Sequence, residues 1–139
     1  MVVVWVVESV VGVDAGVAAL LELAIGGGSD RVDRALERYR VGQVDVAVAR
    51  ADGEVVGVVG YIPGGDRTEL VHIATAPQVR RSGVGAALVA WVREHCGPGV
   101  VEAQTDGDSV GFYRALGFEV ESLGELYPGV ERFAVMLRG

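Results

Sequence analysis

The chain has 139 residues and a formal net charge of −7, and half of its residues are hydrophobic. This length fits one compact domain, so we expect residues 1–139 to fold as a single unit, and the composition excludes a disordered chain. The acidic balance argues against binding to nucleic acid, which needs a basic surface, and favours cationic partners such as amines.

The first forty residues predict one strand and two helices. The apolar, β-branched run Val2–Val7 predicts a buried strand. Asp14 offers an N-cap for a first helix, which should end at glycines 26–28 because glycine costs backbone entropy inside a helix. A second helix should follow, with Ser29 or Asp30 as its N-cap.

The next segment predicts a hairpin and a further strand. Residues 44–50 and 55–62 are β-rich and flank Asp52-Gly53, a strong signal for a tight hairpin between antiparallel strands. The next strand should span about 68–75 and stop before Pro77, which cannot donate to a sheet.

The second half of the chain alternates helices and strands. In order, we expect a helix over 82–95, a strand over 100–105, a short helix capped by Asp106 or Asp108, and strands over 118–123 and 132–137. All strands should join one mixed sheet, giving an α/β fold of about six to seven strands flanked by about four helices.

Apolar stretches and cysteine usage favour a cytoplasmic protein. The longest charge-free stretches, such as Val55 to Gly65, hold 11 residues, and roughly 18 are needed to span a bilayer, so we expect no membrane contact. No Lys or Arg precedes Arg31, so the basic region of a secretory signal is missing. The single cysteine, Cys96, cannot form an internal disulfide, and no metal-ligand spacing surrounds it, which predicts no metal site.

A basic, glycine-containing turn follows the strand over 68–75. In Arg80-Arg81-Ser82-Gly83-Val84-Gly85 the two glycines lack a Cβ, so the backbone can approach a ligand closely. The first amides of the next helix have no intrahelical partner, and with two arginines nearby they suit a pyrophosphate. The glycines could instead serve only close packing of a helix on a strand. The turn lacks the third glycine of a dinucleotide site and the Gly-Lys-Ser/Thr of a P-loop.

Two motifs together resemble the GCN5-related N-acetyltransferase (GNAT) family. Residues 80–85 are similar to its acetyl-CoA signature Arg/Gln-x-x-Gly-x-Gly/Ala, and Pro77 lies six residues before Gly83 as is usual there. Residues 113–118, Tyr-Arg-Ala-Leu-Gly-Phe, resemble its Tyr-x-x-Leu-Gly-Phe hallmark. The predicted order of elements is also similar, although the first 65 residues match only as a pattern of elements. The resemblance implies one N-acetyltransferase domain over 1–139.

The resemblance also implies where the acyl donor, acetyl-CoA, would bind. Its acetyl and pantetheine arm would lie between two splayed strands, held by backbone groups like an added strand, and its pyrophosphate would lie on the amides of residues 81–86. No metal is required. The cofactor-binding residues expected on this basis are Ile73, Ala74, Thr75, Arg80, Arg81, Ser82, Gly83, Val84, Gly85 and Ala86.

Aminolysis of a thioester needs a base for the amine and an acid for the departing thiolate. Period-two alternation predicts that Glu69, Val71, Ile73 and Thr75 share one strand face, and Glu69 also matches the strand position of the base in histone-acetylating relatives. Glu69 could equally be an exposed residue that begins a strand, and water could remove the proton. Tyr113 stands where many relatives keep a hydroxyl near the CoA sulfur, so it is the candidate acid. Alternatively, the Tyr113 ring could serve only to pack against neighbouring side chains.

Other polar residues have weaker cases. Glu102 is a second candidate base, because relatives that modify protein N-termini use a glutamate on this strand. Asp106 stands where the family often has an asparagine that contacts pantetheine, but an N-cap role explains it as well. His72 is expected on the opposite strand face from Glu69 and is assigned no chemistry. Cys96 should lie roughly 20 Å from the turn along a continuous helix, which favours direct transfer in a ternary complex over an acyl-enzyme.

The expected acceptor is a primary amine of a small molecule or a peptide. The junction after the first helix, residues 24–29, and the last strand connection, residues 123–131, should govern acceptor choice, because loops carry specificity. Two alternatives remain open: a non-catalytic acyl-CoA sensor or protein-interaction domain, and a structural subunit whose last strand, residues 133–137, pairs with a second copy. A homodimer is compatible with every one of these functions.

Overall fold

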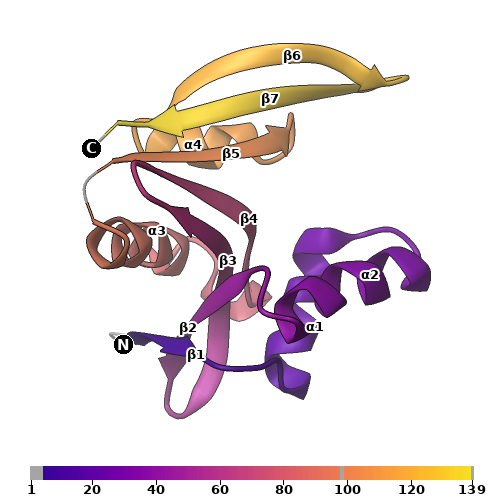
Figure 1. The fold of residues 1–139 in the computed structure, drawn as a ribbon. Helices are drawn as coiled ribbons and strands as arrows, with labels where there is room; N and C mark the ends of the chain where they lie inside the picture. Colours follow the sequence, from indigo (N-terminus) through magenta and orange to yellow (C-terminus); the bar gives the residue numbers. More distant parts are fainter. Residues whose placement is uncertain (1–4, 98, 139) are drawn as a thin grey trace.

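The computed structural model describes residues 5–97 and 99–138, and in this part of the chain a seven-stranded mixed sheet carries helices on both faces (Figure 1). The strand order is β1-β2-β3-β4-β5-β7-β6. The elements are β1 Val6–Val10, α1 Ala15–Ile25, α2 Ser29–Arg40, β2 Asp45–Ala51, β3 Glu54–Gly64, β4 Arg67–Thr75, a 3-10 turn Pro77–Val79, α3 Val84–His95, β5 Val100–Asp106, α4 Val110–Ala115, β6 Glu119–Tyr127 and β7 Val130–Leu137. This is the mixed α/β fold that the sequence predicts.

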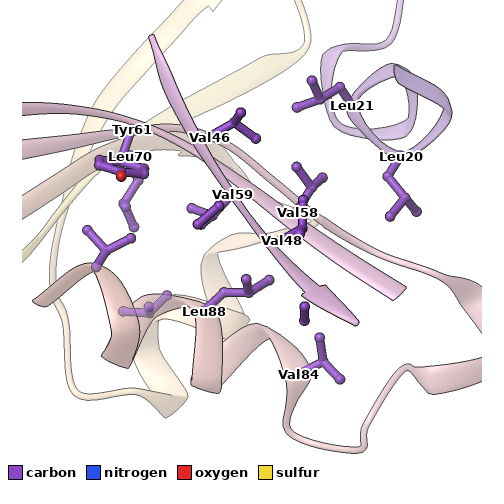
Figure 2. Close-up of a cluster of buried hydrophobic side chains, with 14 of the residues drawn as sticks. Leu20, Leu21, Val46, Val48, Val58, Val59, Tyr61, Leu70, Val84 and Leu88 are labelled. Carbon is purple, nitrogen blue, oxygen red and sulfur yellow. The ribbon is translucent and has the colours of Figure 1, made fainter. Parts of the chain in front are cut away.

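The core forms on both faces of the central strands. Helices α1 and α2 pack on one face of the sheet and α3 and α4 on the other (Figure 1). Leu20 and Leu21 of α1 lie on one side of the strands, and Val84 and Leu88 of α3 lie on the other (Figure 2). Gly57 of β3 allows this approach, because a Cβ there would stand 2.6 Å from the Val84 side chain. None of the helices in the described ranges has the length and apolar character needed to cross a membrane.

Local signals set most of the element boundaries. Asp14 caps α1 as predicted, since its Oδ1 accepts a 2.9 Å hydrogen bond from the amide of Val17. The prediction that Ser29 or Asp30 caps α2 is wrong: Gly28 is the N-cap and makes no side-chain capping bond, so both residues fall inside the first turn. Helix α4 begins after Ser109, which replaces Asp106 and Asp108 as the N-cap residue.

The first strand differs from the prediction of a buried strand. Strand β1 begins at Val6 and continues through Glu8 to Val10, and residues 2–4 of the predicted strand lie outside the described residues. It forms the edge of the sheet beside β2, and the side chain of Val6 is 63% exposed. Glu8 lies in the strand, where it pairs with Val48 of β2, and its Oε1 accepts a 2.8 Å hydrogen bond from Arg50 Nε on that neighbouring strand.

Strand β4 contains an extra residue that changes which side chains share a face. Leu70 pairs with Tyr61 and His72 pairs with Gly60, so Val71 is inserted without a counterpart on β3. Glu69 pairs with Ile62, two residues from Gly60 on an uninterrupted strand, so Glu69 and His72 share one face. The prediction that they lie on opposite faces is wrong.

The same bulge overturns a second prediction. Ile73 and Thr75 pair with Val59 and Gly57, which face α3, whereas Glu69 faces the α1 and α2 side. Glu69 therefore does not share a face with Ile73 and Thr75. A bulge adds one residue to one strand, and every side chain beyond it changes face relative to a regular strand.

Strands β4 and β5 separate beside this bulge. They are the sheet's parallel neighbours within the described residues, and their pairing runs from Arg67↔Val100 to Leu70↔Ala103. Both strands continue past that point, β4 to Thr75 and β5 to Asp106, without pairing to each other, and they diverge in Figure 1. A bulge bends its strand, so the extra residue at Val71 accounts for the divergence. The splayed strands expected from the sequence are present.

Candidate functional site

A cleft of about 850 Å³ lies where β4 and β5 separate. Residues 71–75 of β4 and 104–106 of β5 form its walls. Ala24 of α1 and Arg31 of α2 line it on one face of the sheet, and Tyr113 of α4 lines it on the other. The cleft therefore lies in the gap between the two strands and has lining residues from both faces of the sheet.

The start of α3 supplies free amides at this cleft. Arg81 and Gly83 have left-handed backbone, with φ of +67° and +92°. The amide of Ala87 is the first to bond along the helix, to the carbonyl of Gly83 at 3.0 Å. The preceding amides of residues 84–86 are therefore left without a helical partner, at the positive end of the helix dipole. This end of α3 can bind an anion.

The two glycines of this turn are required for different reasons. Gly83 adopts a conformation that side chains with a Cβ rarely take. Gly85 is helical, and a Cβ there would lie 2.8 Å from the ring of Phe112 in α4. Packing alone therefore explains Gly85, whereas the shape of the turn explains Gly83.

The residues predicted to bind the cofactor divide into two groups. Ile73, Ala74, Thr75, Arg80 and Gly85 line the cleft directly. The others build the turn beside it: Arg81 has positive φ, the hydroxyl of Ser82 donates to the carbonyl of Val79, Gly83 is the N-cap, Val84 is buried in the core, and Ala86 lies in the first helical turn.

Tyr113 packs its ring and also reaches the cleft. Its ring makes edge contacts with Phe112 and Phe118, with centroid distances of 5.1 and 5.2 Å. The residue is 5% exposed, and burial raises the pKa of its hydroxyl to about 12, so the hydroxyl stays protonated at neutral pH. The turn after α4 fixes this position, because the amides of Gly117 and Phe118 bond back to Arg114 and Tyr113.

His72, to which the sequence assigned no role, lines the other side of the cleft. Its Nδ1 lies 2.7 Å from the hydroxyl of Tyr39 in α2. Gly60 makes room for this contact, because a Cβ there would stand 1.8 Å from that hydroxyl. The bulge at Val71 brings His72 to this face, and no pattern in the neighbouring sequence predicts that bulge.

Glu69 lies outside the cleft. It lines a separate hollow of about 470 Å³ on the open face of β5, β7 and β6, and Gln104 lines both spaces. Glu102 pairs directly with Glu69 across the strands and forms a 2.8 Å ion pair with Arg67. The two carboxylates that the sequence singled out thus face the same hollow.

The remaining candidates have structural roles in the described residues. Asp106 lines the cleft, but its Oδ1 also accepts from the amides of Asp108 and Ser109 and holds the turn before α4. Cys96 is the C-cap of α3, at the opposite end of that helix from Gly83. In residues 5–97 and 99–138 no group of three or more His, Cys, Asp or Glu side chains could hold a metal.

Only one of the two predicted acceptor segments reaches the cleft. Ala24 and Ile25, after which α1 ends, line it. Residues 123–131 do not line it and mostly form the β6–β7 hairpin, whereas Arg132, the next residue, does.

Comparisons with known proteins agree with this architecture. The family model described as Acetyltransferase (GNAT) domain matches residues 42–120, more than half of the chain. No curated protein sequence matches the chain.

Solved structures share the fold over nearly the whole chain. A protein from Desulfovibrio desulfuricans described as a GNAT-family acetyltransferase has a TM-score of 0.80 and 23% identity, covering 97% of this chain and 99% of its own. A Bacillus subtilis acetyltransferase in complex with CoA has a TM-score of 0.72 and 20% identity, covering 98% and 99%. The ribosomal-protein-S18-alanine N-acetyltransferase from Escherichia coli has a TM-score of 0.74 and 15% identity, covering 96% and 93%.

Proposed function

Because the chain belongs to the GNAT acetyltransferase family, we propose that it transfers the acetyl group of acetyl-CoA to a primary amine of a small molecule or peptide. The observation that carries this proposal is the cleft through the sheet, with the free amides of α3 beside one opening. Transfer would be direct, within a ternary complex, because the lone cysteine caps the far end of α3. A cytoplasmic setting and a single functional unit over 1–139 are part of the proposal.

Acetyl-CoA supplies an activated acyl group as a thioester. We propose that the backbone of Ile73 and Thr75, on the side of β4 that no longer pairs with β5, holds its acetyl and pantetheine arm, in the way a sheet edge accepts an added strand. The amides of residues 81–86 other than Ser82, whose amide donates to the carbonyl of Val79, would hold its phosphates together with the side chain of Arg80.

Tyr113 is the proposed acid for the departing thiolate. Its hydroxyl remains protonated, and it lies on the α4 side of the cleft, where the free end of α3 also lies. A proton held on this side can reach the sulfur while the amine approaches from the opposite face.

Glu69 is the proposed base, acting directly or through water. It stands on the α1 and α2 face, beside the last residue of β4 that pairs with β5. From the hollow on the open face it would reach an amine that enters the cleft past Gln104. The Glu69→Gln variant tests this role, because an amide cannot accept the proton. Lower kcat with unchanged acetyl-CoA affinity is expected, and unchanged kcat would assign proton removal to water.

Calorimetric titration with acetyl-CoA tests the cofactor site. We expect binding to wild type, and roughly tenfold or weaker binding to Arg80→Glu, which reverses a charge in the cleft. Arg93→Glu is the matched control, since it makes the same charge change on an exposed residue near the other end of α3. Equal affinity of all three proteins would contradict the proposed phosphate site, and absence of binding to folded wild type would contradict the function itself.

Turnover distinguishes an enzyme from a sensor. Benzylamine, spermidine and a short peptide with a free N-terminal alanine sample one small amine, one polycation and one peptide acceptor. Acetylation of any of them, followed by mass spectrometry, supports the transferase. Binding of acetyl-CoA with no acetylation in the panel would favour a non-catalytic sensor.

A further inference from the structure

We propose that His72 stabilises the transition state of acetyl transfer by donating a hydrogen bond from Nε2–H into the cleft. Tyr39 holds the His72 ring in the position that this hydrogen bond needs. This inference rests on the proposed acetyl transfer. Its target is the thioester oxygen as that oxygen gains negative charge.

The position of His72 in the fold supports this role. The bulge at Val71 places His72 just after the last β4–β5 pair, at the point where the gap in the sheet opens. It lines the cleft on the α1 and α2 face, whereas Tyr113 lines it on the α4 face. A donor at this point lies where the gap begins, on the face from which the amine is proposed to enter.

The contact with Tyr39 determines which ring nitrogen is free. Tyr39 is 5% exposed, and its hydroxyl makes one hydrogen bond in the described part of the chain, to Nδ1 of His72. A buried hydroxyl proton needs an acceptor, so Tyr39 donates to Nδ1. In a neutral imidazole the proton then sits on Nε2. In the described residues, every buried side-chain nitrogen or oxygen has a hydrogen-bond partner. Nε2 of His72 has no partner there, so this atom is not fully buried and is open to the cleft.

Packing holds the ring in this orientation. The rings of Tyr39 and His72 have centroids 5.8 Å apart and planes 33° apart. Gly60, the β3 partner of His72, leaves space that the Tyr39 hydroxyl fills. A donor fixed before the reaction costs no reorganisation when charge develops.

The surroundings keep the imidazole neutral. Burial, reinforced by Arg38 and Arg31 of α2, lowers the pKa of His72 to about 4. Helix α1 faces the cleft only with apolar residues, among the described ones. The other titratable groups that line the cleft are Arg80, Asp106, Asp108, Tyr113 and Arg132. Glu69 lies on the same face of β4 as His72.

The proposed step balances without any proton leaving His72. The amine nitrogen forms a bond to the carbonyl carbon, the bond from that carbon to sulfur breaks, and its electron pair stays on sulfur. The proton of the amine passes to Glu69 or water, and the hydroxyl proton of Tyr113 passes to sulfur. Nε2–H only donates to the oxygen, and solvent returns the proton to Tyr113.

Long-range proton–nitrogen NMR on protein labelled with 15N-histidine tests the tautomer directly. The chain has two histidines, so a His95→Gln variant assigns the His72 signals. We expect protonated Nε2 and unprotonated Nδ1 at pH 7. An unprotonated Nε2 would overturn the proposal, whatever the activity.

Kinetics of two substitutions separate a donor from a base. His72→Gln keeps an amide donor near the Nε2 position, whereas His72→Leu removes it. We expect kcat to fall roughly 100- to 1,000-fold in His72→Leu, with acetyl-CoA affinity within about twofold of wild type, and much of kcat to return in His72→Gln. Equal losses in both variants would contradict a donor role, and full activity in His72→Leu would remove His72 from the mechanism.

Tyr39→Phe tests the positioning role. The fall in kcat should be smaller, about tenfold, and Tyr39→Phe combined with His72→Leu should be no slower than His72→Leu alone, because Tyr39 acts through His72. Additive losses would contradict that link. The benzylamine, spermidine and peptide panel serves all variants. A wild type that acetylates none of them contradicts the proposed function and this inference together, whereas an active wild type with an equally active His72→Leu contradicts this inference alone.

Discussion

The burial of His72 should make the free energy of unfolding depend on pH. Its pKa in the folded protein is lowered to about 4, against an ordinary value of 6.5. Between these values the unfolded chain binds a proton that the folded protein does not, so the free energy of unfolding falls as pH falls from 6.5 to 4. The full shift is worth about 3 kcal/mol, and partial exposure of the side chain reduces our expectation to about 2 kcal/mol.

Urea unfolding of wild type and His72→Gln at pH 7 and at pH 4.5 measures this contribution. Carboxylates also titrate in this range, but they are common to both proteins, so the difference isolates His72. We expect wild type to lose about 1–2 kcal/mol more than the variant on acidification. Parallel losses in both proteins would mean that His72 is not held neutral.

Replacing Tyr113 by Phe separates the packing role of the ring from the chemical role of the hydroxyl. Tyr113→Phe keeps the ring that contacts Phe112 and Phe118, so the midpoint of thermal unfolding should stay nearly unchanged. Loss of the acid should lower kcat up to about 100-fold, near the low end for general acid catalysis, because a thiolate is already a good leaving group. Steady-state kinetics and an acetyl-CoA titration check this expectation. Unchanged kcat would leave Tyr113 as a packing residue.

At the scale of elements, the contact between α2 and β3 depends on one glycine. A Cβ at Gly60 would lie 1.8 Å from the Tyr39 hydroxyl and 2.6 Å from its Cζ, so Gly60→Ala must displace the Tyr39 ring. We expect a loss of about 1–3 kcal/mol in the free energy of unfolding. Gly107→Ala is the control, because a Cβ there meets nothing within 4 Å.

A second substitution identifies the clash. Tyr39→Phe removes the nearest atom but leaves Cζ, so in the Gly60→Ala background it should recover only part of the loss. Denaturant unfolding of the two single variants and the double variant measures this coupling. Additive destabilisation would show that the alanine is accommodated without moving the ring.

Elements with local signals were predictable from the sequence. Asp14 as an N-cap and Asp52-Gly53 as a hairpin turn each act on their immediate neighbours in the chain, so the sequence places them correctly. The exposure of β1 was not predictable, because it depends on which strand lies at the edge of the sheet.

The candidate site was predictable only in part, for the same reason. Its glycine turn and Tyr113 belong to short motifs, whereas the pair His72 and Tyr39 joins residues 33 apart in the chain. That pair exists because of the bulge at Val71, and a bulge follows from pairing between strands rather than from any one residue.

At the scale of the whole molecule, the cleft beside α3 and the separate hollow on the open face differ in charge. Arg80 lines the opening near α3, where the anionic cofactor is proposed to bind. The hollow on the open face has four glutamates, of which Glu102 and Glu119 pair with arginines and leave Glu69 and Glu121 to set its charge. With a net charge of −7, the protein should attract a cationic acceptor to this face while a local basic cluster holds the phosphates.

Ionic strength should therefore affect both substrates, through different residues. Raising salt from about 50 to about 300 mM shortens the Debye length from above 10 Å to below 8 Å. We therefore expect a several-fold higher KM for spermidine. The change in KM for benzylamine should be smaller, because benzylamine carries less charge. Glu121→Gln should flatten the response of spermidine and leave that of acetyl-CoA, whereas Arg80→Glu should do the reverse. Steady-state kinetics of the three proteins at both salt concentrations measure this. If Glu121→Gln changed both responses equally, the charge on the open face would act through the net charge of the protein and not at an acceptor entrance.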